Sequence, residues 1–216
     1  MLKELLKYMV IGVVAGIASY VLISEEPVSI SVNHSDSNSQ NIITKNSYNY
    51  IYNNVKESVV TIQTDIGRGS GVVVTNHGHV VTNEHVIKGA KKVVITTADN
   101  KTHNAKIVGV DSITDIALLS SAYKGKSITF SDSSKVKIGD IVLAIGNPFG
   151  VGQTLTQGII SRTNSGHITE NPLDEFLQSD AAINPGNSGG AMVDINGNLI
   201  GINTMNVSIG GGSDGI

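Results

Sequence analysis

Short runs of Val, Ile and Thr recur along most of the chain, and polar or glycine-containing turns separate them. Such runs, bounded by Gly, Asn and Asp, are typical of β-strands. Between them, Asn83 can cap a short helical turn over Glu84–Lys88 that ends at Gly89. The dipeptide Asn196–Gly197 predicts a tight hairpin. The expected strands are Ser58–Thr64, Ser70–Thr75, Val93–Thr97, Ala105–Val110, Asp140–Ile145, Thr154–Ser161, Ala191–Ile195 and Asn198–Asn203.

These strands fall into two successive sets, with the polar segment Ser131–Gly139 between them. Two all-β units in series fit two small barrels better than one continuous sheet. We therefore expect an all-β fold with a first barrel over residues 47–135 and a second over residues 136–216.

The N-terminal part has a different pattern. Lys3 and Lys7 precede the apolar run Tyr8–Ile23, and acidic residues follow it. Positive charge before an apolar run predicts a cytoplasmic N-terminus and an exported remainder. We favour a membrane anchor within residues 1–24 over a cleaved signal sequence, and residues 25–46, rich in Ser and Asn, read as a flexible linker.

Composition narrows the possible functions. The chain has no cysteine, which excludes disulfides, thiolate catalysis and zinc held by cysteine. Its formal net charge is −3, so it lacks the basic character of a nucleic-acid-binding protein.

The segment Asn184–Gly190 (NPGNSGG) places Ser188 among glycines. A serine hydroxyl becomes a nucleophile when a base takes its proton, and the resulting oxyanion needs donors already directed at it. Glycines let the backbone turn tightly there, so that the N–H groups of Gly186 and Ser188 can converge on one oxygen. The alternative is an ordinary glycine-rich turn.

Of the six histidines, His85 is the candidate base, because it lies where a strand passes into a helical turn. An orienting carboxylate is then required. Asp115, directly before an apolar strand, is favoured, and Asp111 is the alternative. A zinc site built from His77, His79 and His85 is a weaker reading, since no histidine–carboxylate signature accompanies it.

Tyr48, Tyr50 and Tyr52 alternate along the chain. In an extended segment they would share one face, where they could cover the first barrel or form a contact between subunits.

Taken together, these motifs resemble the HtrA (Deg) serine proteases. The resemblance runs from about residue 47 to residue 216 and rests on segments in the family's order. The segments are Gly69–Val72 (GSGV), Val81–Val86 (VTNEHV), Thr114–Leu119 (TDIALL), Ala144–Gly150 (AIGNPFG), Thr156–Ser161 (TQGIIS) and Gln178–Gly190 (QSDAAINPGNSGG).

The resemblance implies a chymotrypsin-like fold of two antiparallel six-stranded β-barrels and a catalytic triad of His85, Asp115 and Ser188. It adds Asn187 to the oxyanion donors Gly186 and Ser188. It also implies an ATP-independent endopeptidase that cleaves unfolded or damaged exported proteins on the periplasmic side of the inner membrane, without metal or cofactor. The expected substrate pocket is formed by Ala181, Ala182, Ile183, Asn203, Thr204 and Met205.

Family members form trimers through residues near the start of the protease domain, which favours a homotrimer. They also continue with a final strand, a helix and PDZ domains, so the chain ending at Ile216 predicts an incomplete second barrel and no PDZ domain. A non-catalytic chaperone or scaffold on the same fold is the alternative function.

Overall fold

The computed structural model describes residues 47–147, 152–163, 176–204, 206–207 and 214–215. The expected anchor, the expected linker and the pocket residue Met205 lie outside these residues. Within the described part of the chain, no helix is long and apolar enough to span a bilayer.

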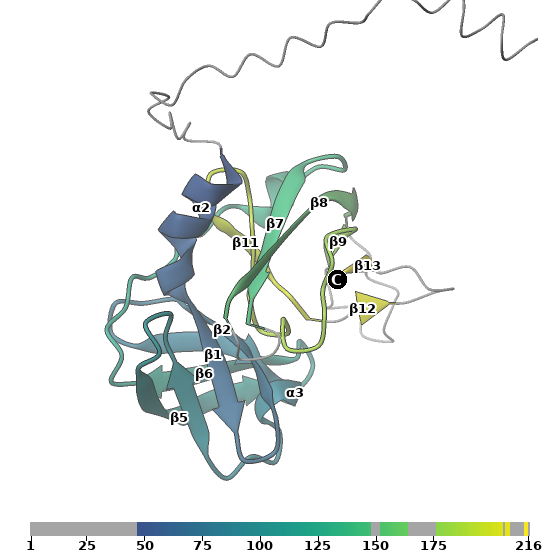
Figure 1. Ribbon diagram of the computed structural model, residues 1–216. Helices are drawn as coiled ribbons and strands as arrows, with labels where there is room; N and C mark the ends of the chain where they lie inside the picture. The colour runs from purple at the N-terminus through teal and green to yellow at the C-terminus, as the bar shows by residue number, and fades with distance from the viewer. Residues whose placement is uncertain (1–46, 148–151, 164–175, 205, 208–213, 216) are drawn as a thin grey trace, which may run out of the picture. The chain divides into compact units, whose positions relative to one another are not determined.

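The first half is a closed antiparallel barrel with the strand order β1-β2-β3-β6-β5-β4, which confirms the predicted barrel (Figure 1). Its strands are β1 (Val59–Thr64), β2 (Arg68–Val73), β3 (His79–Asn83), β4 (Val93–Thr96), β5 (Thr102–Asp111) and β6 (Ile116–Ser121). The helical turn α3 (Glu84–Ile87) follows β3 directly, where Asn83 predicted it.

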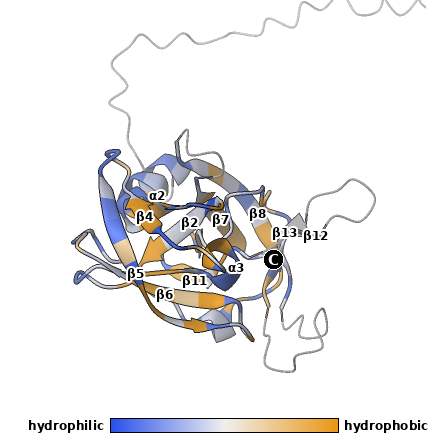
Figure 2. Ribbon diagram, turned by 90° about the horizontal axis from the view of Figure 1, so that it is seen from below, coloured by the Kyte–Doolittle hydropathy of each residue, from blue (hydrophilic) through white to orange (hydrophobic). Residues whose placement is uncertain are grey.

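The alternation of buried and exposed side chains along the strands explains why the first half closes into a barrel. Along β3 and β4, buried and partly exposed residues alternate, so that one face of each strand enters a common core. Figure 2 shows hydrophobic residues gathered on the strands and mostly hydrophilic residues in the connecting loops. That core consists of Val60, Ile62, Val73, Val80, Val86, Ile87, Val93, Ile95, Ala117 and Leu119.

The second half is also antiparallel, but it forms a curled seven-stranded sheet with the order β11-β10-β7-β8-β9-β13-β12. This curled sheet agrees with the incomplete second barrel that the resemblance implies: among the described residues the edge strands β11 and β12 do not pair. The strands are β7 (Ile141–Gly146), β8 (Thr154–Arg162), β9 (Gln178–Ser179), β10 (Ala191–Val193), β11 (Leu199–Ile202), β12 (Asn206–Val207) and β13 (Asp214–Gly215).

The hairpin at Asn196–Gly197 has a longer loop than expected, since β10 ends at Val193 and β11 begins at Leu199. Asp194 organises this loop, because its Oδ1 accepts from the N–H groups of Asn196 and Asn198. A single left-handed residue, Gly197 with φ +79°, replaces the two that a two-residue turn would need.

The tyrosine-rich segment is not extended. It forms the helix α2 (Tyr48–Val55), which leads through the 3₁₀ turn η1 (Lys56–Ser58) into β1. Ser47 caps the helix, since its side chain accepts from the N–H of Tyr50 at 3.3 Å. The helical spacing of Ile51 and Val55, four residues apart and both buried, outweighs the period-two alternation of the tyrosines.

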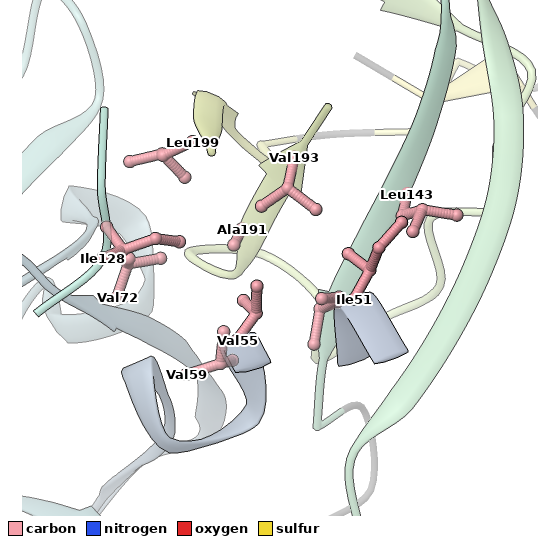
Figure 3. Packing of buried hydrophobic residues seen from close by; sticks show 10 residues of the cluster. Ile51, Val55, Val59, Val72, Ile128, Leu143, Ala191, Val193 and Leu199 are labelled. Atoms are coloured by element: carbon pink, nitrogen blue, oxygen red, sulfur yellow. The ribbon is translucent and has the colours of Figure 1, made fainter. Parts of the chain in front are cut away.

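Helix α2 stabilises the contact between the halves. Ile51 and Val55 pack with Val59 and Val72 of the first barrel and with residues of the second sheet (Figure 3). The second-sheet members of this shared core are Leu143, Ile145, Ala191, Val193 and Leu199. The helix therefore belongs to the core that joins the two halves.

Replacing Ile51 by alanine should lower the free energy of unfolding by about 2–5 kcal/mol, because it leaves a cavity in this shared core. Asn49→Ala is the matched control. In a strand Asn49 and Ile51 would face the same side, whereas in the helix Asn49 is exposed. Chemical denaturation should show a change within about 0.5 kcal/mol for Asn49→Ala. Equal losses for both variants would contradict the helical packing.

Candidate active site

The pairing of β3 with β6 brings the expected base and acid together. Asn83, the last residue of β3, lies opposite Ile116, the first residue of β6. His85 follows the one strand end and Asp115 precedes the other. The separation of His85 Nδ1 and Asp115 Oδ2 is 2.6 Å, and the backbone N–H of His85 donates to Asp115 Oδ1 at 2.9 Å. The carboxylate thus holds both the ring and the backbone of the histidine.

Asp115 has a left-handed backbone with φ +55°, a conformation that aspartate tolerates better than most residues. Its carbonyl oxygen accepts from the N–H of Glu84 at 3.0 Å and from Nδ2 of Asn83 at 3.0 Å. The start of α3 and the end of β3 therefore fix the turn that presents the carboxylate.

The alternative acid, Asp111, has a different task. Its carboxylate accepts from the N–H of Ile113 and the hydroxyl of Thr114, so it closes the turn before Asp115. These hydrogen bonds, that of the Ile113 N–H first, hold the pKa of Asp111 below its ordinary value. Asp115, and not Asp111, contacts His85.

Asn83 occupies the N-cap position of α3, as expected, but its side chain makes no capping hydrogen bond. It is fully buried, and besides the Asp115 carbonyl its Nδ2 donates to Thr204 Oγ1 at 3.1 Å. The side chain of Asn83 thus joins the acid-bearing turn of the first barrel to the second half.

The turn that carries Ser188 depends on two left-handed glycines. Gly186 has φ +97° and Gly189 has φ +82°. At Gly189 a Cβ atom would lie 2.1 Å from the carbonyl oxygen of Ser70, so no larger residue fits there. The turn closes through hydrogen bonds from the N–H of Asn187 to Asn184 O and from the N–H of Gly190 to Asn187 O.

These bonds determine which donors remain for an oxyanion. The N–H of Asn187, the third expected donor, donates to the carbonyl oxygen of Asn184 at 2.9 Å. The N–H groups of Gly186 and Ser188 have no acceptor within the described part of the chain. Backbone N–H groups without an acceptor are the kind of donor that an oxyanion requires.

The Ser188 hydroxyl donates to the carbonyl oxygen of Thr204 at 3.1 Å. No hydrogen bond joins it to His85 among the described residues. Nucleophile–base hydrogen bonds are often long or absent without substrate, and rotation about one side-chain bond redirects a serine hydroxyl.

The expected pocket residues differ in accessibility. Ala181 and Ile183 are buried against Ala144, whereas Ala182 is partly exposed. Asn203 is fully buried, and its Nδ2 donates to the carbonyl oxygens of Ile145 and Ala191. Among the described residues of this set, Ala182 is therefore the one with a partly exposed side chain.

Two histidines of the alternative zinc site, His79 and His85, have other partners. His79 Nδ1 lies 2.9 Å from Thr75 Oγ1, and His85 pairs with Asp115. The described residues contain no cluster of three or more metal-ligating side chains.

In the sequence, Ser70 is visible only as part of the motif GSGV, which does not indicate a role for it. The structure places this serine in β2 with no exposed surface, directly against the nucleophile turn. A small polar residue between two glycines in an otherwise apolar strand was the available signal.

Comparison with known proteins identifies the family. The model of the trypsin-like peptidase domain matches residues 69–202. The periplasmic pH-dependent serine endoprotease DegQ of Escherichia coli (strain K12) is 47% identical over 153 residues, covering 69% of this chain and 34% of DegQ. The serine endoprotease DegS of Salmonella typhimurium (strain 14028s / SGSC 2262) is 40% identical over 223 residues, covering 95% of this chain and 61% of DegS.

Among solved structures, the HtrA-type protease AlgW with a tripeptide superposes with a TM-score of 0.74 at 42% identity, covering 79% of this chain and 59% of AlgW. A fold of two β units with a site between them, matched by the peptidase family over most of its described length, defines the class: the chain belongs to the trypsin-like peptidases. Within that class its relatives are the HtrA (Deg) serine endoproteases. The chain spans about a third of the length of DegQ.

Proposed function

We propose that the protein is an ATP-independent serine endopeptidase with the catalytic triad Ser188, His85 and Asp115. The observation that carries the proposal is the pairing of His85 Nδ1 with the Asp115 carboxylate at 2.6 Å, in a trypsin-like peptidase fold. The turn that carries Ser188 also has two N–H groups without an acceptor among the described residues. A histidine oriented by a carboxylate is the base that a serine hydroxyl needs.

The proposed reaction begins when Ser188 Oγ attacks the carbonyl carbon of the scissile peptide bond. Nε2 of His85 takes the hydroxyl proton, and the N–H groups of Gly186 and Ser188 donate to the oxyanion. His85 then returns the proton to the leaving amine, and the C–N bond breaks to give an acyl-enzyme. Water, deprotonated by the same histidine, hydrolyses the ester and restores the serine.

Asp115 keeps the proton of neutral His85 on Nδ1, which leaves Nε2 free to act as the base. It also stabilises the imidazolium that forms in each half-reaction. Every step uses protein side chains and backbone donors, so we propose no metal and no cofactor.

The proposed substrates are unfolded or damaged exported polypeptides with a small or medium aliphatic residue at the cleavage position. The segment 181–183 contributes no acidic side chain to attract Lys or Arg. Partly exposed Ala182 leaves room for an apolar side chain of modest size.

We further propose that the apolar run Tyr8–Ile23 is an uncleaved single-pass anchor in the cytoplasmic membrane, with the protease domain on the periplasmic side. Support comes from the basic residues before the run and from the periplasmic relative DegQ. In this proposal the anchor lies within residues 1–24 and the linker spans residues 25–46. The two protease units are residues 47–135 and 136–216.

The proposed triad predicts large losses of activity for Ser188→Ala and Asp115→Asn, and almost none for Asp111→Asn. Ser188→Ala should abolish hydrolysis of an unfolded protein such as reduced casein, with a loss of roughly 10⁶-fold in kcat. Asp115→Asn should lower kcat by about 10⁴-fold, because it stabilises the wrong histidine tautomer. Asp111→Asn is the matched control and should leave kcat nearly unchanged.

These rates are to be measured on purified full-length protein of verified fold. Turnover by Ser188→Ala equal to that of the parent would contradict the proposal. An inactive parent that still suppresses aggregation of unfolded protein would instead favour the chaperone alternative.

The anchor predicts that protein isolated from membranes begins at Met1 or Leu2 and resists extraction by salt or alkali, because an apolar helix remains embedded in the bilayer. N-terminal sequencing checks this directly. A mature protein that begins near Ser19 would show a cleaved signal sequence instead.

We also propose a homotrimer, on the strength of the HtrA relationship. Tyr48, Tyr50 and Tyr52 all stay at least partly exposed in the single chain, so they remain available for contacts between subunits. Light scattering on full-length protein should give a trimeric mass, and replacing the three tyrosines with serine should shift it to monomer, since aromatic residues dominate such interfaces. A monomeric mass for folded, active parent protein at micromolar concentration would refute the trimer.

A further inference from the structure

Ser70 lies in β2, fully buried, and directly opposite Thr61 of β1. Its hydroxyl donates to the carbonyl oxygen of Gly186 at 2.8 Å and accepts from the N–H of Asn147 at 2.8 Å. Its backbone N–H donates to the carbonyl oxygen of Ser188 at 2.8 Å. One side chain of the first barrel thus meets both the nucleophile turn and the end of β7.

Glycines make this approach possible. A Cβ atom at Gly146, the last residue of β7, would lie 3.0 Å from Ser70 Oγ, and one at Gly69 would lie 3.1 Å from Ser188 O. Gly146 and Gly69 therefore let the surrounding backbone pack closely around Ser70. The bond between Ser70 Oγ and Gly186 O is a direct link between residues 116 positions apart.

This link acts on a particular peptide unit. The Gly186–Asn187 peptide is held at its carbonyl by Ser70 Oγ and at its N–H by the carbonyl of Asn184. Since a peptide unit is planar, holding both ends fixes its rotation. The Gly186 N–H belongs to the preceding peptide, and its direction is linked to this plane through the two backbone dihedrals of Gly186, of which φ is +97°.

On the other side of the nucleophile, the Ser188–Gly189 peptide is held by the backbone N–H of Ser70. Ser70 therefore holds peptide units on both sides of Ser188, one through its side chain and one through its backbone. The hydroxyl can be removed by substitution while the backbone bond remains.

We propose that the Ser70 hydroxyl is a positioning residue for the oxyanion donors: it holds the Gly186–Asn187 peptide so that the Gly186 N–H points at the developing oxyanion. This inference rests on the proposed endopeptidase function. Ser70 touches no reacting atom, and its effect passes through Gly186.

The test is Ser70→Ala in the full-length protein, with Thr61→Val as the matched control. Thr61 faces Ser70 across the strand pair, and its Oγ1 accepts from Nδ2 of the same Asn147 at 2.7 Å. Thr61→Val removes a buried hydrogen bond between the halves and keeps the side-chain shape, but it touches no atom of the nucleophile turn.

For Ser70→Ala we expect kcat to fall by about 10–100-fold, because a misdirected donor costs somewhat less than the roughly 10²–10³-fold loss of a whole oxyanion donor. KM should change little. Affinity for a peptide boronic acid, whose tetrahedral adduct mimics the transition state, should fall by a factor similar to that in kcat/KM. Thr61→Val should lower Tm by about as much as Ser70→Ala does, since it removes a comparable hydrogen bond. Its kcat should nevertheless stay within about 3-fold of that of the parent.

Rates are taken per folded molecule, with the folded fraction from thermal unfolding. If the alanine variant does not fold, Ser70→Cys fills the same position with a weaker donor and should also lower kcat with KM unchanged. A folded Ser70 variant with kcat equal to that of the parent would overturn the inference, as would equal losses for Ser70→Ala and Thr61→Val. An inactive parent protein, or one whose activity survives Ser188→Ala, would overturn the proposed function itself and not only the role of Ser70.

Discussion

The chemistry of this site depends on how closely two separately folded halves are held together. His85 and Asp115 belong to the first barrel and Ser188 to the second half, so a small shift between them would separate the proposed base from the proposed nucleophile. Two kinds of contact oppose that shift: the apolar core shared through α2, and direct hydrogen bonds across the boundary. The core holds the halves together, and the hydrogen bonds determine their exact relative position.

Several hydrogen bonds across the boundary lie at the site. Asn83 joins the turn of Asp115 to Thr204, and Ser70 joins β2 to the nucleophile turn. Farther away, Gln153 Nε2 donates to the carbonyl oxygens of Lys56 and Val59. Buried hydrogen bonds add little net stability but are costly to break, so they favour one relative placement over near alternatives.

The strands were predictable because their side chains alternate, and the contact of His85 with Asp115 was predictable because each residue stands next to a strand end. The helix α2 was not predicted, since the alternating tyrosines suggested an extended segment and obscured the spacing of Ile51 and Val55. Local patterns did not assign a role to Ser70, whose hydroxyl partner lies 116 residues away, and did not show that the N–H of Asn187 closes a turn. Such roles depend on which segments meet in space.

The central claim, that Ser188 is activated by a histidine held on the other half of the molecule, is tested most directly by mapping covalent modification with a fluorophosphonate. Such a probe labels a serine only where a base assists it. The account predicts one adduct per chain, on the peptide that contains Ser188, and none when His85 is replaced by alanine. Labelling elsewhere, or equal labelling of Ser188 without His85, would contradict it.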